Sequence, residues 1–227
     1  MPRLIYIHGY VEDASIFDKL IPLLPTESIV KLDLETDFAR WNPKDSTVNV
    51  STLATYLVNT YQISPSDVVI GHSMGGWIAA NLKAQTGCRA VLIAGFTDQK
   101  KIITYTRNMT VVKWLVKLGV VQSPWLARYA LRIYRFDDSR ALHEELVERL
   151  MSQSRRYIYQ QLRVLLAPYP VAPAEPDLRI HARPDPIIRY PDEPCTETPG
   201  DHFNLAFHTD LVAKPILALL VGVGQGA

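Results

Sequence analysis

The 227 residues suffice for one domain with a sizeable core, and a content of 48% hydrophobic and 21% charged residues is globular, which excludes a disordered chain. The net charge of +1 gives no overall field that would attract nucleic acid, so we expect no nucleic-acid partner. Charge is nevertheless uneven, because residues 98–165 hold 13 Lys and Arg against 6 Asp and Glu.

Short apolar runs alternate with helical patterns in the first half of the chain. Apolar runs rich in β-branched residues predict buried strands at Leu4–Ile7, Ile29–Asp33, Val68–Ile70 and Arg89–Gly95. Helical spacing predicts a short helix over 15–21, a helix capped by Ser51 and Thr52 that ends near Tyr61, and one over 77–84, whereas 35–50 is typical of a loop. Strands that alternate with helices predict a parallel sheet covered on both faces.

The alternation stops after the fourth strand. Residues 98–166 contain no convincing strand, and helical patterns occupy 109–118, 126–134, 142–150 and 157–166. We interpret them as a helical lid inserted into the domain, and the alternative is that they belong to the layer covering the sheet. Residues 1–97 and 167–227 would then form the core.

The last part of the chain returns to the sheet. After a proline-rich stretch, strands are predicted at Leu178–Ala182 and around 194–198. A closing helix is predicted over 205–221, interrupted or restarted at Pro215.

The clearest functional signal lies in residues 67–79. Here a strand is followed by Gly71-His72-Ser73-Met74-Gly75 and then by a helix, and G-x-S-x-G in that setting indicates a nucleophile elbow. Glycines two residues before and after Ser73 leave room for a sharp turn, which places the hydroxyl at a helix N-terminus where negative charge is favoured. The alternative is a tight turn in which Ser73 merely caps the helix.

A serine nucleophile needs a base, and the base needs an acid that orients it. In parallel sheets, reacting groups gather at the carboxyl ends of the strands. His202 follows the last strand within a glycine-containing turn, so it is the predicted base. His72 would point away from the serine and pack beneath the elbow. The remaining histidines are interpreted as bracing, structural or solvated: His8, His143, His181 and His208.

Asp185 is the predicted acid, because it follows the penultimate strand between two prolines and precedes His202 by 17 residues. Asp98, after the fourth strand, is its main rival. Asp201 adjoins His202 and is badly placed to reach its ring, and Asp192 is a weaker candidate.

An oxyanion needs backbone donors. The N–H of Met74, directly after Ser73, is one predicted donor. The second is expected from the loop after the first strand, where Gly9 permits a close turn and Tyr10 N–H is the favoured group.

Four segments now resemble the α/β-hydrolase fold family, within its lid-bearing esterase and C–C hydrolase branches. His8-Gly9-Tyr10 is similar to the family's oxyanion loop and 71–76 to its elbow. Arg183-Pro184-Asp185 is similar to its acid loop, and Gly200-Asp201-His202-Phe203 to its histidine loop. The resemblance implies a serine hydrolase, a fold of about six mostly parallel strands and an inserted lid.

Two departures from the family stand out. The usual leading antiparallel hairpin is not found before Leu4, which predicts an essentially all-parallel sheet. Asp201 occupies a position where a small residue is expected, so a second carboxylate either acts on the base or faces solvent.

The leading hypothesis is therefore hydrolysis of a small-molecule ester or thioester by Ser73, His202 and Asp185, with Tyr10 and Met74 as oxyanion donors and without a cofactor or metal. An anionic substrate would suit the basic segment, although solvated helix faces explain the same charge. The alternatives are C–C bond hydrolysis or lyase chemistry in the same fold, and a receptor that binds a ligand without turnover. Trp114, Trp125, Tyr129 and Tyr134 could line an acyl pocket, but helix packing is the favoured role for most of them.

The cellular compartment is predicted from the absence of membrane-spanning and signal-peptide patterns and from the cysteines. The longest apolar tract, Leu211 to Val223, contains Lys214 and Pro215, and no segment has the length of a membrane span or the pattern of a signal peptide. Cys88 and Cys195 lack metal-ligand spacing and fit a reducing compartment, so we expect a cytoplasmic protein.

Overall fold

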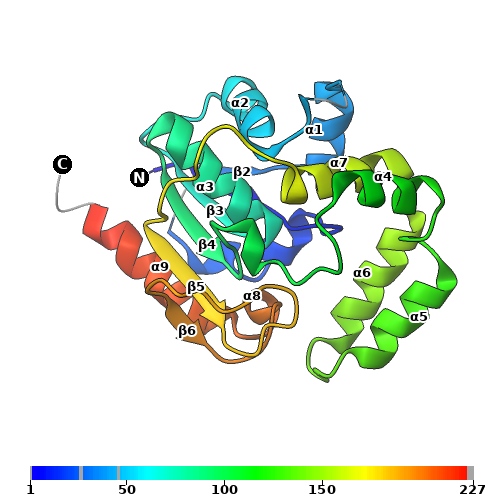
Figure 1. Ribbon diagram of the computed structural model, residues 1–227. Helices are drawn as coiled ribbons and strands as arrows, with labels where there is room; N and C mark the ends of the chain where they lie inside the picture. Colours follow the sequence, from blue (N-terminus) through cyan, green and yellow to red (C-terminus); the bar gives the residue numbers. More distant parts are fainter. Residues whose placement is uncertain (1, 26–27, 45–46, 224–227) are drawn as a thin grey trace.

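One parallel sheet forms the centre of the computed structural model, which describes residues 2–25, 28–44 and 47–223 (Figure 1). Its six strands lie in the order β2-β1-β3-β4-β5-β6, and every neighbouring pair is parallel, which confirms the predicted sheet. The strands are β1 (Leu4–Ile7), β2 (Ile29–Lys31), β3 (Val68–His72), β4 (Arg89–Ile93), β5 (Leu178–Ala182) and β6 (Thr196–Thr198).

Helices lie in most of the connections between these strands and after β6. The α-helices are α1 (Leu34–Trp41), α2 (Val50–Tyr61), α3 (Met74–Thr86), α4 (Met109–Lys117), α5 (Pro124–Ile133), α6 (Arg140–Ser152), α7 (Arg155–Leu166), α8 (Asn204–Phe207) and α9 (Thr209–Val223). Short 3-10 helices are η1 (Ala14–Phe17), η2 (Ile21–Leu23) and η4 (Gln99–Lys101). Within the described ranges, no helix combines the length and the apolar character that crossing a bilayer requires.

Alternate residues of each strand supply two separate cores. Ile5, Ile7 and Val69 point to the face covered by α1, α2, α3 and α7. Tyr6 and Ile70 point to the opposite face, where η1, α8 and α9 cover the sheet. Because both faces are buried, the strands β1, β3 and β4 are largely continuous apolar runs rather than alternating ones, and this is why they could be located from the sequence.

The helices between β4 and β5, here called the helical segment (98–166), differ in burial. Helix α7 packs into the core beside α3, and the indole of Trp77 donates a hydrogen bond of 2.9 Å to the Val164 carbonyl of α7. Helices α5 and α6 lie side by side at the outside of the molecule (Figure 1). The division of the chain into a core and a lid at 98 and 166 stays a prediction.

Three aromatic side chains of the helical segment are not packed as expected. Trp114 is 53% exposed, Trp125 is 68% exposed and Tyr129 is 42% exposed, so the prediction that most of the four aromatics pack between helices was wrong. The physical reason is local, because α5 buries none of its residues and leaves Trp125 and Tyr129 stacked on each other at 6.0 Å. Only Tyr134 of the four predicted aromatics is buried.

Helix α1 lies where a loop was predicted over residues 35–50. Asp33 caps it by accepting from Thr36 N–H, and Leu34 and Phe38 are buried beneath it. Asn42 ends it in the left-handed conformation, with φ of 40°. The turn-forming residues that suggested a loop therefore belong to the stretch after the helix.

Two other helix boundaries differ from the prediction. Helix α2 begins at Val50, and its cap is Asn49, which forms a capping box with Thr52. The closing helix is broken at His208, between α8 and α9, and not at Pro215, which lies inside α9. Burial of Val212, Ala213 and Ile216 against the sheet offsets the one backbone hydrogen bond that a proline removes.

Candidate active site

The elbow is as sharp as its glycines suggested. Ser73, between β3 and α3, has φ of 52° and ψ of −115°, a conformation that is strained for a residue with a side chain. Helix α3 starts directly against β1, since a Cβ added at Gly75 would lie 1.9 Å from the Ile7 carbonyl oxygen. A Cβ at Gly71 would lie 2.2 Å from the Gly75 backbone. Only glycine fits at these two positions, and together they hold Ser73 at the end of the strand.

The sheet order brings the loop after β1 (residues 8–12, the β1 loop) to the same place. The chain moves to one side of β1 to form β2 and to the other side to form β3, and ligands bind at such a switch point in α/β sheets. Ile7 pairs in register with Gly71, so the two loops start level with each other. A Cβ at Gly9 would lie only 2.9 Å from the Ser73 Cβ.

Hydrogen bonds within the β1 loop single out one backbone donor. Gly9 N–H donates to the Glu12 carboxylate at 2.6 Å, and Val11 N–H donates to Gln161 Oε1 of α7 at 3.0 Å. Tyr10 N–H, between them, has no acceptor among the described residues, and the same is true of Met74 N–H at the start of α3. The two backbone groups predicted as oxyanion donors are therefore not used by hydrogen bonds within the described part of the chain.

His202 and Asp185 are joined as the sequence suggested. The histidine loop (residues 199–203) follows β6, the acid loop (residues 183–188) follows β5, and His202 Nδ1 lies 2.7 Å from Asp185 Oδ2. Both side chains are buried. Ile187 and Ile188 donate their N–H groups to the other oxygen of Asp185, at 2.7 and 2.8 Å. This carboxylate is thus held from both sides.

The Asp185 carboxylate is maintained in its charged form. Burial by itself opposes the charge, but the charge of His202 and the hydrogen bond from its ring outweigh burial, so the pKa of Asp185 lies below its ordinary value of 3.8. An ionised Asp185 accepts a hydrogen bond from the Nδ1–H of His202, which leaves Nε2 as the ring nitrogen available to a second partner.

The serine and the histidine are not hydrogen-bonded to each other in this structure. Among the described residues, Ser73 Oγ makes no hydrogen bond with the His202 ring. The neighbouring His72 ring lies 5.1 Å from the His202 ring, centroid to centroid. In free enzymes catalytic hydrogen bonds are often long and shorten only when substrate binds.

The rival acids are occupied elsewhere. Asp98 is exposed and caps η4, where it accepts from Lys100 N–H at 2.8 Å. Asp192 is also exposed and pairs with Lys101 at 2.7 Å. Neither carboxylate contacts the His202 ring.

The other histidines are mainly structural. His8 is buried and braces the β1 loop, because its Nε2 accepts from Leu34 N–H and its Nδ1 lies 3.0 Å from the Gly9 carbonyl. His181 is buried in β5, 3.3 Å from the Ile188 carbonyl. His143 is partly buried and stacks on Tyr134 at 3.9 Å, so it does not lie on a fully solvated helix face.

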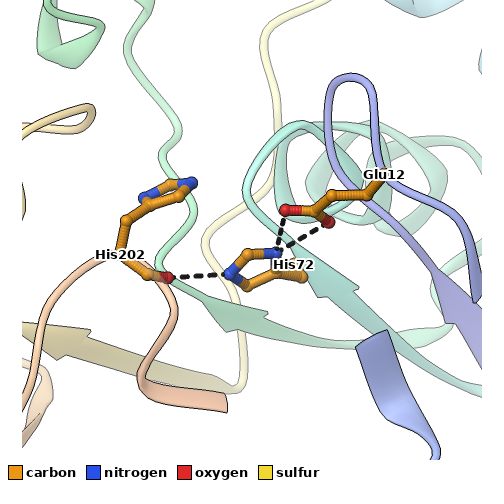
Figure 2. Close-up of side chains that lie close together, drawn as sticks. All are labelled: Glu12, His72 and His202. Carbon is orange, nitrogen blue, oxygen red and sulfur yellow. Dashed lines mark hydrogen bonds and ion pairs between the residues drawn. The ribbon is translucent and has the colours of Figure 1, made fainter. Parts of the chain in front are cut away.

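Glu12 is the residue of this site that sequence reasoning missed. It is buried, and its carboxylate lies 2.9 Å from His72 Nδ1, while His72 Nε2 lies 2.9 Å from the His202 carbonyl oxygen (Figure 2). One signal was present, because position 12 belongs to the loop that follows the first strand, at the edge where reacting groups gather. His72 itself packs beneath the elbow, as predicted.

Glu12, His72 and His202 are also the group from which a metal site could be built. One ligand atom from each lies within 4.8 Å of the others. However, Nε2 of His72 already bonds a carbonyl oxygen and Nδ1 already bonds Glu12. We therefore interpret the Glu12 and His72 side chains and the His202 carbonyl as a hydrogen-bonded network, and we assign no metal to these residues.

Asp201 is buried rather than solvated, and it joins the histidine loop to the helical segment. One of its oxygens accepts from Phe203 N–H at 2.9 Å. The other accepts from the hydroxyls of Tyr134, after α5, and Ser139, before α6. These contacts attach the α5–α6 hairpin to the loop that carries His202.

The Tyr134 hydroxyl is expected to matter for stability because its partner is a buried carboxylate. Hydrogen bonds to charged groups contribute about 1.5–3 kcal/mol, so Tyr134→Phe should lower the free energy of unfolding by about that amount. Denaturant titration measures this change. Tyr105→Phe is the control. Tyr105 is 90% exposed, so loss of its hydroxyl should leave the midpoint of the denaturant titration unchanged. An unchanged midpoint in Tyr134→Phe would show that the contact adds nothing.

A cavity of about 430 Å³ lies between α5 and the acid loop. Apolar side chains make most of its wall, among them Ile133 of α5 and Pro184 and Ile187 of the acid loop. Arg135 and His143 are its basic residues. The cavity thus combines an apolar wall with a cation and borders the loop that carries Asp185.

The fold and the arrangement of these loops define an α/β hydrolase. Residues 4–224 match the family model described as the alpha/beta hydrolase family, and the chain belongs to that family. No curated protein matches it in sequence.

Solved structures share the fold at low sequence identity. An enol-lactonase from Burkholderia xenovorans superposes with a TM-score of 0.70 at 13% identity, over 97% of this chain and 91% of that one. An esterase from Thermogutta terrifontis gives 0.65 at 13% identity, over 98% and 90%. A carboxylesterase from Bacillus subtilis gives 0.60 at 15% identity, over 97% and 84%.

Proposed function

We propose that this hydrolase cleaves a carboxylic ester or thioester through an acyl-enzyme formed on Ser73. The observation that carries the proposal is the buried His202–Asp185 pair, 2.7 Å apart, delivered to the same sheet edge as a serine in a strained elbow. Strain of this kind persists only where the surrounding structure enforces it, and it is concentrated at functional sites.

Each group has a role that follows from its contacts. Ser73 Oγ attacks the carbonyl carbon, and Nε2 of His202 takes the hydroxyl proton, because Nδ1 is bonded to Asp185. The N–H groups of Tyr10 and Met74 hold the oxyanion, since neither is used within the described part of the chain. His202 then protonates the leaving group and activates the water that releases the acyl group.

The cavity beside the acid loop suits a small substrate with an apolar part. Its volume of about 430 Å³ lies in the range of small-molecule sites. Arg135 on its wall would favour a substrate that also carries an anionic group. In this proposal the α5–α6 hairpin acts as the lid over the site, because it forms one wall of the cavity and is attached to the histidine loop through Asp201.

Two of the structural neighbours named above are an esterase and a carboxylesterase, and an enol-lactone is itself an ester. At such low sequence identity their likeness to this chain shows the fold alone, and the activity is proposed from the site.

A panel of substrates tests the proposal. It combines p-nitrophenyl esters of increasing acyl length, acyl-CoA thioesters, and diketones whose cleavage breaks a C–C bond. We expect turnover of at least one ester or thioester series, with an acyl-length optimum set by the cavity. Cleavage of diketones alone would replace ester hydrolysis by C–C chemistry. A ligand that raises the melting temperature without being converted, in the absence of any turnover, would indicate a receptor.

A further inference from the structure

A second pair of a histidine and an acid lies directly beside the His202–Asp185 pair. His72 and Glu12 are both buried, and both oxygens of the carboxylate face His72 Nδ1 (Figure 2). The proposed chemistry at Ser73 uses neither side chain. A buried carboxylate is costly unless it is paired and hydrogen-bonded, so its presence beneath the site needs a reason.

The partners of His72 determine where its protons are. A carbonyl oxygen only accepts, so Nε2, which faces the His202 carbonyl, carries a proton. At Nδ1 one further proton is shared with Glu12. Burial opposes charge on both groups, but their mutual attraction and hydrogen bond outweigh it, so the pKa of His72 is raised and that of Glu12 is lowered. These directions favour an imidazolium paired with a carboxylate over a neutral pair. Each polar atom of the two side chains faces the other side chain or a backbone group.

The pair reaches three separate loops. Glu12 accepts from Gly9 N–H in the β1 loop, His72 belongs to the elbow strand, and His72 donates to the carbonyl of His202 in the histidine loop. These loops carry one proposed oxyanion donor, the serine and the base. They are far apart in the sequence, and the pair connects them by an unbroken series of hydrogen bonds.

Backbone strain marks the turn that brings Glu12 back to Gly9. Val11 has φ of 65°, although a β-branched residue strongly avoids positive φ. Gln161 of α7 fixes Val11 by accepting its N–H at 3.0 Å. The strained turn keeps Gly9 N–H on Glu12 and leaves Tyr10 N–H free beside Ser73.

From this geometry we propose that Glu12 and His72 are positioning residues that hold the β1 loop and the histidine loop in register with Ser73. The inference rests on the proposed hydrolase function, because register matters only if these loops act on one substrate. Displacement of a reacting group by about 1 Å costs about 10²-fold in rate, so loss of the network should appear in kcat.

Four variants separate positioning from simple stability. Glu12→Ala removes the acceptor of Gly9 N–H. In Glu12→Gln the amide oxygen still accepts from Gly9 N–H, and the amide N–H₂ donates to Nδ1 of His72, which is then neutral. Both hydrogen bonds of residue 12 are therefore kept without charge. In His72→Asn an amide replaces Nδ1 and the bond to His202 is lost, whereas in His72→Gln an amide replaces Nε2 and that bond is kept.

The matched structural control is Asp37→Ala. Asp37 is also a buried carboxylate, in α1, and its side chain bonds the Tyr61 hydroxyl and no residue of the site. The Asp37→Ala substitution should lower the melting temperature without changing kcat per active site. Active sites are counted by titration with a fluorophosphonate, so that misfolded protein does not enter kcat.

With an ester substrate, we expect Glu12→Ala and His72→Asn to lower kcat by about 10²-fold with little change in KM. Glu12→Gln should recover most of that loss, whereas His72→Gln, which keeps the bond to His202 but loses the bond to Glu12, should recover only part of it. Wild-type kcat in the folded Glu12→Ala and His72→Asn proteins would overturn the proposal. It would also be overturned if Glu12→Gln were as impaired as Glu12→Ala, since hydrogen bonding would then not be the cause.

A spectroscopic readout keeps the inference separate from the proposed function. The proton between His202 Nδ1 and Asp185 gives a downfield NMR signal in a rigid pair, and it does not depend on turnover. We expect the signal in the wild type, Glu12→Gln and Asp37→Ala, and its broadening or loss in Glu12→Ala and His72→Asn. If the wild type cleaves no ester, the proposed function fails, and the NMR comparison still decides whether the pair holds the histidine loop. An identical signal in all variants would refute that role.

Discussion

Ser73→Ala is expected to lower kcat for the best ester substrate by about 10⁶-fold, the loss seen when a serine nucleophile is removed from a comparable triad. The reason is that Ser73 supplies the hydroxyl at the end of β3, where the N–H groups of Tyr10 and Met74 have no acceptor among the described residues. Steady-state kinetics with the substrate found in the panel measures the loss. The substitution should leave the fold intact, because Ser73 Oγ makes no hydrogen bond among the described residues.

Non-additivity is the control for this prediction. His202→Ala should cost about as much as Ser73→Ala, and the double variant should be no worse than either, because the two side chains act as one unit. Additive losses would mean that Ser73 and His202 contribute independently, and substantial kcat in Ser73→Ala would exclude an acyl-enzyme on this residue.

Asp185→Asn is expected to lower kcat by about 10⁴-fold. The amide oxygen can still accept from Ile187 and Ile188, which then turns the amide N–H₂ towards His202 Nδ1. His202 is driven into the tautomer with the proton on Nε2, and that nitrogen can no longer take the proton of Ser73. The measurement is kcat with KM in parallel, and KM should change little because Asp185 does not contact substrate in the proposed mechanism.

The pH dependence of stability gives the same variant a second readout. The folded-state pKa of Asp185 is lowered below 3.8, so its charge contributes stability above that pH, and the contribution is lost as the pH falls through the folded-state pKa. The difference in melting temperature between the wild type and Asp185→Asn should therefore shrink on acidification. A difference that grows towards low pH would contradict the assigned pairing.

Much of the fold was accessible from the sequence because both faces of the sheet are buried. The continuous apolar run Leu4–Ile7 was located to the residue, and so was the strand Leu178–Ala182, although Arg179 and His181 interrupt its apolar residues. The pairing of His202 with Asp185 was accessible for a related reason, since parallel strands end at one edge and each side chain directly follows a strand. The roles of these residues in catalysis stay predictions.

The errors had three different physical causes. Asp33 and the buried Phe38 are enough to form α1 in a stretch rich in turn residues. Glu12 was missed because its burial depends on His72, 60 residues away, and on the strained turn at Val11. The exposure of Trp114 and Trp125 could not be seen in helical spacing, which shows which residues share a face but not what covers it.

The most direct test of the central claim is the site of a covalent label. The wild-type protein would be treated with a fluorophosphonate probe, digested, and the modified peptide sequenced by mass spectrometry. The proposed mechanism predicts one adduct per chain, on Ser73, which disappears in Ser73→Ala and forms far more slowly in His202→Ala. Absence of labelling in the folded wild type, or an adduct that persists in Ser73→Ala, would contradict it.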